Sequence, residues 1–187
     1  MGKRTMVGLL AVTVAALLLA SLGGKEDRPP AADLAGRGAP AGNPDFALLM
    51  ALQGDWRGTL RDGSITEEAL VRYRMVSGGQ AVEERTYPDT ENEVVTVYYV
   101  EDGNVKMHHF CALGNRPNMV SGRGPVREGE STVVRFACPP ADPLTHEPHM
   151  HAATIALRDA DHLTVTWTMS VAGAPAWERV FALAREE

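Results

Sequence analysis

Residues 162–171 constrain the fold more than any other stretch, because apolar and polar side chains alternate there without a break. Leu163, Trp167 and Met169 belong to the apolar side, and threonines and a serine occupy the other side. A period of two is that of an extended strand, and an apolar side opposite a polar one indicates one buried and one solvated face. The stretch is therefore predicted to be a strand of an antiparallel sheet.

Segments of similar composition recur over residues 55–184, separated by turn sequences such as Asp62-Gly63 and Ala172-Gly173. Such spacing is typical of hairpins rather than of parallel strands joined by helices. We therefore predict an all-β fold, a single antiparallel up-and-down β-barrel of about ten strands. A cone-shaped α+β fold is the alternative, which the scarcity of helical patterns disfavours. The expected strands are residues 55–61, 65–76, 80–87, 93–101, 105–112, 118–122, 132–137, 150–158, 162–171 and 176–184.

The same alternation predicts which side chains of other strands face the barrel interior. Several of these faces carry polar groups among apolar ones, and such groups are costly to bury without partners. The predicted inward sets are His151, Ala153, Ile155 and Leu157; Val105, Met107, His109 and Cys111; Trp177, Arg179, Phe181 and Leu183; and Val95, Val97 and Tyr99.

A short helix is predicted just before the first strand. Asn43 is a candidate N-cap, Pro44 suits the first helical position, and Gly54 ends the apolar stripe that follows. We expect this helix to close one end of the barrel. The domain would then cover residues 44–187, after a flexible linker at residues 24–43 that is rich in Ala, Gly and Pro.

The N-terminal segment predicts export. Lys3 and Arg4 precede an apolar run over residues 6–22, with a cleavage site expected at residues 21–23. This arrangement is that of a secretory signal peptide, residues 1–23, and predicts a periplasmic or secreted protein. An uncleaved membrane anchor is the alternative, because the run approaches the length that spans a bilayer. No cysteine lies near the run, which excludes a lipid-anchored lipoprotein.

Charge argues against a nucleic-acid partner. The chain has 18 Lys and Arg against 24 Asp and Glu, a formal net charge of −6, and no basic run follows the N-terminal segment. We expect membrane contact only through that segment, if it is not cleaved. The two cysteines, Cys111 and Cys138, would lie in an oxidising compartment, so a disulfide and a pair of buried thiols both stay open.

The predicted helix followed by Gly54-Asp55-Trp56 resembles the opening of lipocalins and the wider calycin superfamily. The resemblance implies that Trp56 begins the first strand at the closed end and that an Arg of the last strand packs across its indole. Arg179 is the matching candidate, with Arg185 as the second choice. About ten strands suit fatty-acid-binding or nitrobindin-like barrels better than the eight of true lipocalins.

The central block of the chain also resembles a group of uncharacterised bacterial exported proteins. The similarity runs through residues 98–99 and 109–117 and includes His149-Met150-His151. That group brings no established activity with it.

Polar residues predicted to face the barrel interior are the candidates for chemistry. His109 and His151 lead, with Glu84 as a third member. Histidine pairs suit zinc, copper or iron, so His109, His149 and His151 are metal candidates, and one inner His would serve as an axial haem ligand. The alternative is that these histidines only satisfy hydrogen bonds inside a packed barrel.

Three functions follow from these residues. The first is an exported protein that binds a small, largely apolar ligand in the barrel. The second is a metal- or haem-binding protein or enzyme that uses His109, His151 and Glu84, although no nucleophile or phosphate-loop motif indicates an enzyme. The third is a packed interaction module of the envelope. The predicted ligand-binding residues are His109, His151, Glu84, Trp167, Met169, Met107, Asn115 and Arg116.

Overall fold

The computed structural model describes residues 40–122, 124–140, 144 and 146–187. In this part of the chain each strand pairs antiparallel with a neighbour, and nearly every pair is consecutive in sequence. The strands are β1 (Gly54–Asp62), β2 (Ile65–Val76), β3 (Ala81–Thr86), β4 (Val94–Glu101), β5 (Asn104–Phe110), β6 (Asn118–Ser121), β7 (Val126–Glu128), β8 (Ser131–Ala137), β9 (His149–Leu157), β10 (His162–Val171) and β11 (Ala174–Arg185).

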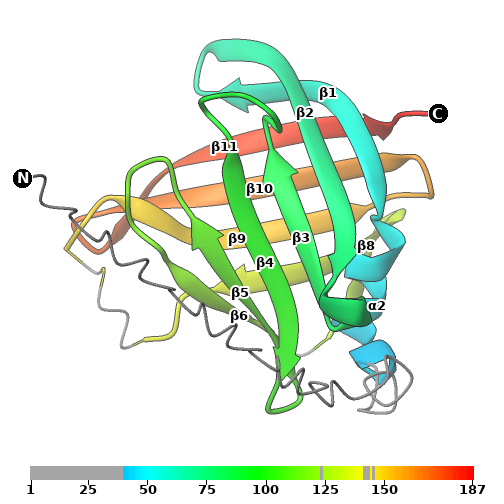
Figure 1. The fold of residues 1–187 in the computed structure, drawn as a ribbon. Helices are drawn as coiled ribbons and strands as arrows, with labels where there is room; N and C mark the ends of the chain where they lie inside the picture. Colours follow the sequence, from blue (N-terminus) through cyan, green and yellow to red (C-terminus); the bar gives the residue numbers. More distant parts are fainter. Residues whose placement is uncertain (1–39, 123, 141–143, 145) are drawn as a thin grey trace, which may run out of the picture.

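Two pairings between strands that are not consecutive close the sheet into a barrel (Figure 1). The first joins β1 to β11, and the second joins β6 to β8. The short strand β7 pairs with β8 alone among the described strands, so ten strands form the barrel wall. The predicted fold class is confirmed: an all-β, antiparallel, up-and-down barrel. The strand β7 was missed, because its three exposed residues lie in a Gly-rich stretch that reads as a turn.

Helix α2 (Pro44–Ala51) lies at one end of the barrel, as predicted (Figure 1). The Asn43 side chain accepts a hydrogen bond from the Phe46 backbone N–H at 3.1 Å, which satisfies a donor of the first turn. The buried side of the helix is apolar except for Asp45, and Phe46 and Leu49 are fully buried. Two 3-10 turns, η1 (Pro40–Gly42) and η2 (Ser77–Gly79), are the other helical segments of the described chain.

Trp56 fills the helix end of the barrel, which we call the floor. Its side chain is fully buried, and the indole Nε1–H donates to the Leu52 carbonyl at 2.7 Å. The Arg185 guanidinium lies 4.2 Å from the centre of the indole ring. Arg185 also donates to the carbonyls of Gln53 and Ala51, at 2.6 and 2.9 Å. One arginine thus joins the helix end, the first strand and the last strand.

The prediction that Arg179 packs on Trp56 was wrong, and the second choice, Arg185, occupies that position. The register of β1 against β11 places Trp56 opposite Arg185 and Asp62 opposite Arg179. Six strand residues span about 20 Å, so Arg179 lies near the other end of the barrel. There its Nε donates to Asp62 Oδ2 at 2.7 Å. Both arginines share one strand face, and only the register tells them apart.

Two glycines of β1 allow the close contacts at this seam. Gly54 has a φ of +131°, a conformation that L side chains rarely adopt, and a Cβ there would lie 3.0 Å from an Arg185 nitrogen. A Cβ on Gly58 would lie 2.0 Å from the Ala182 carbonyl oxygen of β11. Glycine at both positions therefore lets the first and last strands meet.

The inward face of β4 differs from the predicted one. Thr96 and Tyr98 point inward and are fully buried, whereas Val95, Val97 and Tyr99 are only half-buried. Every residue over 94–100 is apolar or aromatic except Thr96, so the strand shows no clear alternation. The polar interior partners of Thr96 and Tyr98, described below, decide its orientation.

The predicted signal peptide and most of the predicted linker lie outside the described residues. Within the described residues no helix has the length and apolar character needed to cross a bilayer.

Replacement of Trp56 by alanine is expected to lower the free energy of unfolding by about 3–5 kcal/mol, the usual effect of emptying a buried aromatic site. Chemical denaturation followed by circular dichroism measures this loss. Trp177→Ala is the matched control, because Trp177 is 43% exposed and its loss is expected to cost about 0.5 kcal/mol or less. A loss below about 1 kcal/mol for Trp56→Ala would contradict its role at the floor.

Candidate functional site

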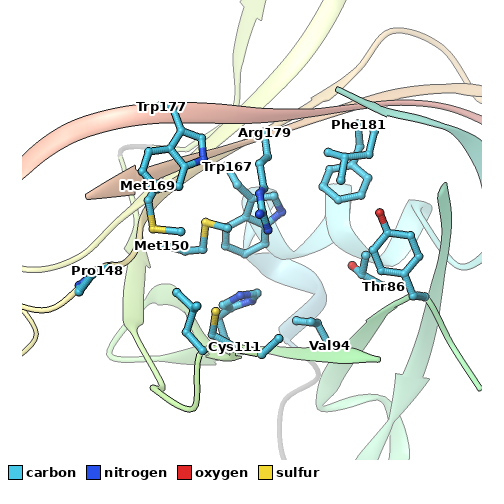
Figure 2. A pocket seen from close by; sticks show the side chains of 15 residues that line it. Thr86, Val94, Cys111, Pro148, Met150, Trp167, Met169, Trp177, Arg179 and Phe181 are labelled. Carbon is cyan, nitrogen blue, oxygen red and sulfur yellow. The ribbon is translucent and has the colours of Figure 1, made fainter. Parts of the chain in front are cut away.

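The end of the barrel opposite the floor holds a cavity of about 330 Å³, which we call the mouth cavity. In Figure 2, Trp177, Arg179 and Phe181 point into it from β11, and Cys111 and Val94 lie across from them. Most of its wall is apolar, as in typical small-molecule sites. The lining residues are Leu60, Thr86, Tyr87, Val94, His109, Cys111, Ala112, Leu113, Pro148, Met150, Trp167, Met169, Trp177, Arg179 and Phe181.

His109 is one of two buried polar residues of the described cavity wall, the other being Thr86. Its side chain packs against Trp167 with ring centres 4.4 Å apart, and a hydrogen bond of 2.9 Å joins its Nδ1 to the Thr96 hydroxyl. Burial lowers the pKa of His109 from 6.5 to about 4, because the charged imidazolium would lose its hydration there. The ring is therefore neutral at physiological pH, and it can donate or accept a hydrogen bond.

Arg179 supplies the positive charge of the cavity wall. Its guanidinium is held by Asp62 of the neighbouring strand, and the two side chains are 39% and 27% exposed. Near it, the apolar side chains of Trp177 and Leu113 are 43% and 57% exposed. The mouth cavity thus has an apolar rim and one ion pair at its edge.

Glu84 lies inside the barrel, on the β3 strand between two tyrosines. Its carboxylate accepts a hydrogen bond from the Tyr98 hydroxyl at 2.8 Å, and Tyr73 is its cross-strand partner on β2. Burial raises the pKa of Glu84 above its ordinary value, although the tyrosine hydroxyls oppose this shift. Burial, together with the nearby Glu84 charge, raises the pKa of Tyr73 and of Tyr98 well above 10.0. This polar group belongs to the barrel interior and does not line the mouth cavity.

His151 does not share the cavity with His109, contrary to the prediction. The register of β10 against β9 pairs Thr168 with Ala152 and Met169 with Met150, so His151 is an extra residue in a bulge. The bulge reverses the alternation, and Met150 points into the mouth cavity instead. His149 and His151 line a separate hollow on the other side of β9. Alternation from Ala153 predicts that His151 faces inward. The sequence does not mark the bulge, so the reversed direction of His151 could not be predicted.

The other predicted ligand-binding residues divide into two groups. Trp167 and Met169 line the mouth cavity, and their binding of a ligand stays a prediction. Met107 is fully buried in the core away from it, and neither Asn115 nor Arg116 is among the described residues that line it. Asn115 has a different task, because its side-chain amide donates to the Pro148 carbonyl at 2.8 Å and so supports the loop before β9.

No disulfide joins Cys111 and Cys138 in the structure, where both cysteines are described. Cys111 follows the end of β5 and lines the mouth cavity. Cys138 follows the end of β8 and lies beside His149 and His151, so the two thiols belong to different sites. The predicted interior trio of His109, His151 and Glu84 is likewise not brought together.

Several cavity residues were not predicted as ligand-binding. Alternation along the last strand predicts that Phe181 and Arg179 face inward, so the sequence contains the information that places them at the cavity. Met150 was hidden by the bulge. Leu113 and Pro148 belong to loops, where no periodicity indicates the direction of a side chain.

The fold and the site together define a closed ten-strand antiparallel β-barrel with a helix at one end and an apolar cavity at the other. No family model and no curated protein matches the chain. Among solved structures it is similar to a protein of unknown function from the DUF3598 family of Nostoc punctiforme, with a TM-score of 0.45 and 13% identity. The similarity covers 74% of this chain and 49% of that protein, so the chain spans about half of its length.

The buried state of His109 predicts a loss of stability in acid. The unfolded chain binds the proton near pH 6.5, whereas the folded chain binds it near pH 4. The free energy of unfolding is therefore highest above pH 6.5. It falls as the pH is lowered from 6.5 to 4, by at most about 3 kcal/mol. A proton NMR titration of the His109 ring measures its pKa directly. A midpoint near 6.5 in the folded protein would contradict the buried, neutral imidazole.

Proposed function

We propose that this protein binds a small, largely apolar molecule in the mouth cavity. The observation that carries the proposal is the cavity of about 330 Å³ itself, whose wall combines aromatic and sulfur-containing side chains with a few polar groups. Ligand sites of proteins have this composition, and their volumes start at about 300 Å³. Burial of apolar ligand surface against Trp167, Met150 and Phe181 would supply most of the binding free energy.

Two polar groups of the wall decide which kind of ligand the cavity favours. The neutral His109 ring offers a hydrogen bond without the desolvation cost of a charge, so it suits a hydroxyl, carbonyl or amide group. Arg179 at the edge is already paired with Asp62, which reduces its attraction for an anionic group. The site therefore favours a mostly apolar molecule with one neutral polar group over a carboxylate or a phosphate.

A neutral fluorescent apolar probe, N-phenyl-1-naphthylamine, and a panel of medium-chain alcohols and fatty acids test this proposal. We expect saturable binding of the probe, competition by the alcohols, and a change in the emission of the cavity tryptophans, because Trp167 and Trp177 line the cavity. Cys111→Trp, which fills the cavity, is expected to weaken binding at least tenfold, or about 1.4 kcal/mol. Cys111→Ser at the same position keeps the cavity and is the matched control.

Equal binding to the Cys111→Trp and Cys111→Ser variants would contradict a ligand site in the mouth cavity. Lack of saturable binding by the whole panel would instead favour the packed interaction module. A Soret band in the purified protein would point to haem, with His109 as the axial candidate.

We further propose that the protein acts outside the cytoplasm and that its barrel is related to the calycins. Lys3 and Arg4 ahead of the apolar run at residues 6–22 support export. The arginine stacked on Trp56, next to Gly54, supports the calycin relation. Mass spectrometry of the protein from its producing cells is expected to find a mature chain that begins near Gly24. An intact chain from Met1 would favour the membrane anchor.

A further inference from the structure

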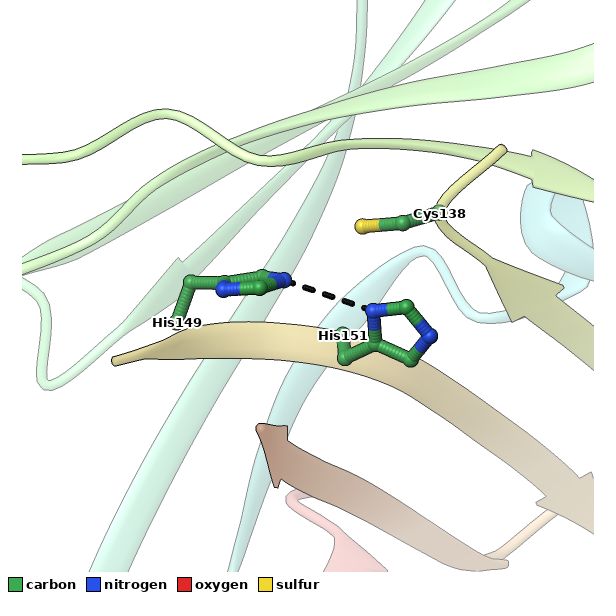
Figure 3. Close-up of side chains that lie close together, drawn as sticks. All are labelled: Cys138, His149 and His151. Carbon is green, nitrogen blue, oxygen red and sulfur yellow. Dashed lines mark hydrogen bonds between the residues drawn. The ribbon is translucent and has the colours of Figure 1, made fainter. Parts of the chain in front are cut away.

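We propose that Cys138, His149 and His151, which we call the rim cluster, bind a zinc ion. The three side chains lie close together at the mouth end of the barrel, outside the mouth cavity (Figure 3). One ligand atom from each residue lies within 4.8 Å of the others. The proposed ligand-binding function does not depend on this site.

The spacing of the two imidazoles fits a metal ion between them. His149 Nε2 and His151 Nδ1 are 3.3 Å apart. Tetrahedral zinc with Zn–N bonds of about 2.0–2.1 Å places two nitrogen ligands about 3.3–3.4 Å from each other. The two nitrogens therefore need almost no movement to become ligands. The ion would replace the hydrogen bond that now joins them.

The backbone around the rim cluster holds the three side chains on one side of β9. His149 and His151 are two residues apart on β9 and project to the same side of it. Cys138, just beyond the end of β8, donates its backbone N–H to the His151 carbonyl at 2.9 Å. This hydrogen bond holds the thiol next to the two rings.

A hydrogen bond outside the cluster sets the tautomer of His149. A carbonyl oxygen can only accept, so His149 Nδ1–H donates to the Glu147 carbonyl at 2.7 Å. The lone pair of a neutral His149 is therefore on Nε2, the atom that faces His151. Metal-binding histidines in proteins are commonly held in this way by a backbone carbonyl.

The set of donors selects the metal. One thiolate and two imidazoles suit zinc and exclude the oxygen-preferring Mg²⁺ and Ca²⁺. On binding, the Cys138 thiol gives its proton to solvent, and the proton of His151 moves to Nε2, so the Nδ1 lone pair can bind the ion. Three protein ligands leave a fourth tetrahedral position for water. The three side chains line a hollow of about 350 Å³ together with Ser170, which gives a water room to bind.

Titration of the reduced, full-length protein with Zn²⁺, in competition with a chromophoric chelator, tests the site. We expect one Zn²⁺ per chain. Replacement by Co²⁺ should give a sulfur-to-cobalt charge-transfer band in the near ultraviolet. Loss of an outer partner alone weakens metal binding by about 10- to 100-fold, so loss of a ligand in Cys138→Ser or His151→Asn should weaken zinc binding by more than about 100-fold.

Cys111→Ser is the matched control for the thiol, because Cys111 lies in the mouth cavity and should leave zinc affinity and the cobalt band unchanged. Cys138 is buried, so Cys138→Ser can fail to fold for reasons unrelated to zinc. His151 is half-buried, so His151→Asn is the second variant that tests the site in a folded protein. Failure to bind Zn²⁺, a cobalt spectrum without the charge-transfer band, or zinc affinity unchanged in His151→Asn would overturn the proposal. Binding of Cu⁺ without Zn²⁺ would also overturn it.

Discussion

The contact of Arg185 with Trp56 is the interaction on which the rest of the structure depends. A barrel must join its first strand to its last. Here β1 carries Trp56, β11 carries Arg185, and the two side chains stack on each other. The indole also holds the end of helix α2 through the Leu52 carbonyl, and the guanidinium holds the carbonyls of Ala51 and Gln53 on either side of it. The same contacts therefore close the sheet, position the helix and bury the floor of the barrel. Gly54 and Gly58 contribute by leaving room for it.

With one end filled, the opposite end can stay open. Beyond the floor, the interior passes from the Glu84 group with its tyrosines to the wall of the mouth cavity at His109. Hydrogen bonds join Tyr98 to Glu84 and Thr96 to His109, and these two pairs also fix the orientation of β4, whose sequence alternates poorly. Near the mouth, the bulge in β9 sends Met150 to one side and His149 and His151 to the other. A single irregular residue thus separates the proposed apolar site from the proposed zinc site.

Sequence patterns predicted the architecture well and the site only in part. Period-two alternation and Gly-containing turns depend on local chemistry, so β2 and β10 were predicted with their observed ends. Positions set by pairing between strands were harder to predict. Arg179 and Arg185 cannot be distinguished without the register of β11, and His151 faces away from the interior because of a bulge that leaves no mark in the sequence. The inward direction of His109, Trp167 and Met169 follows from alternation that continues along their strands up to the cavity.

A double-mutant cycle between Trp56→Phe and Arg185→Met tests the central claim most directly. The free energies of unfolding of the wild type, the two single variants and the double variant give the coupling between the two side chains. A guanidinium stacked on a buried indole should give a coupling of about 0.5–2 kcal/mol. If the two losses simply add, Arg185 and Trp56 do not act together, and this account of how the barrel closes is wrong.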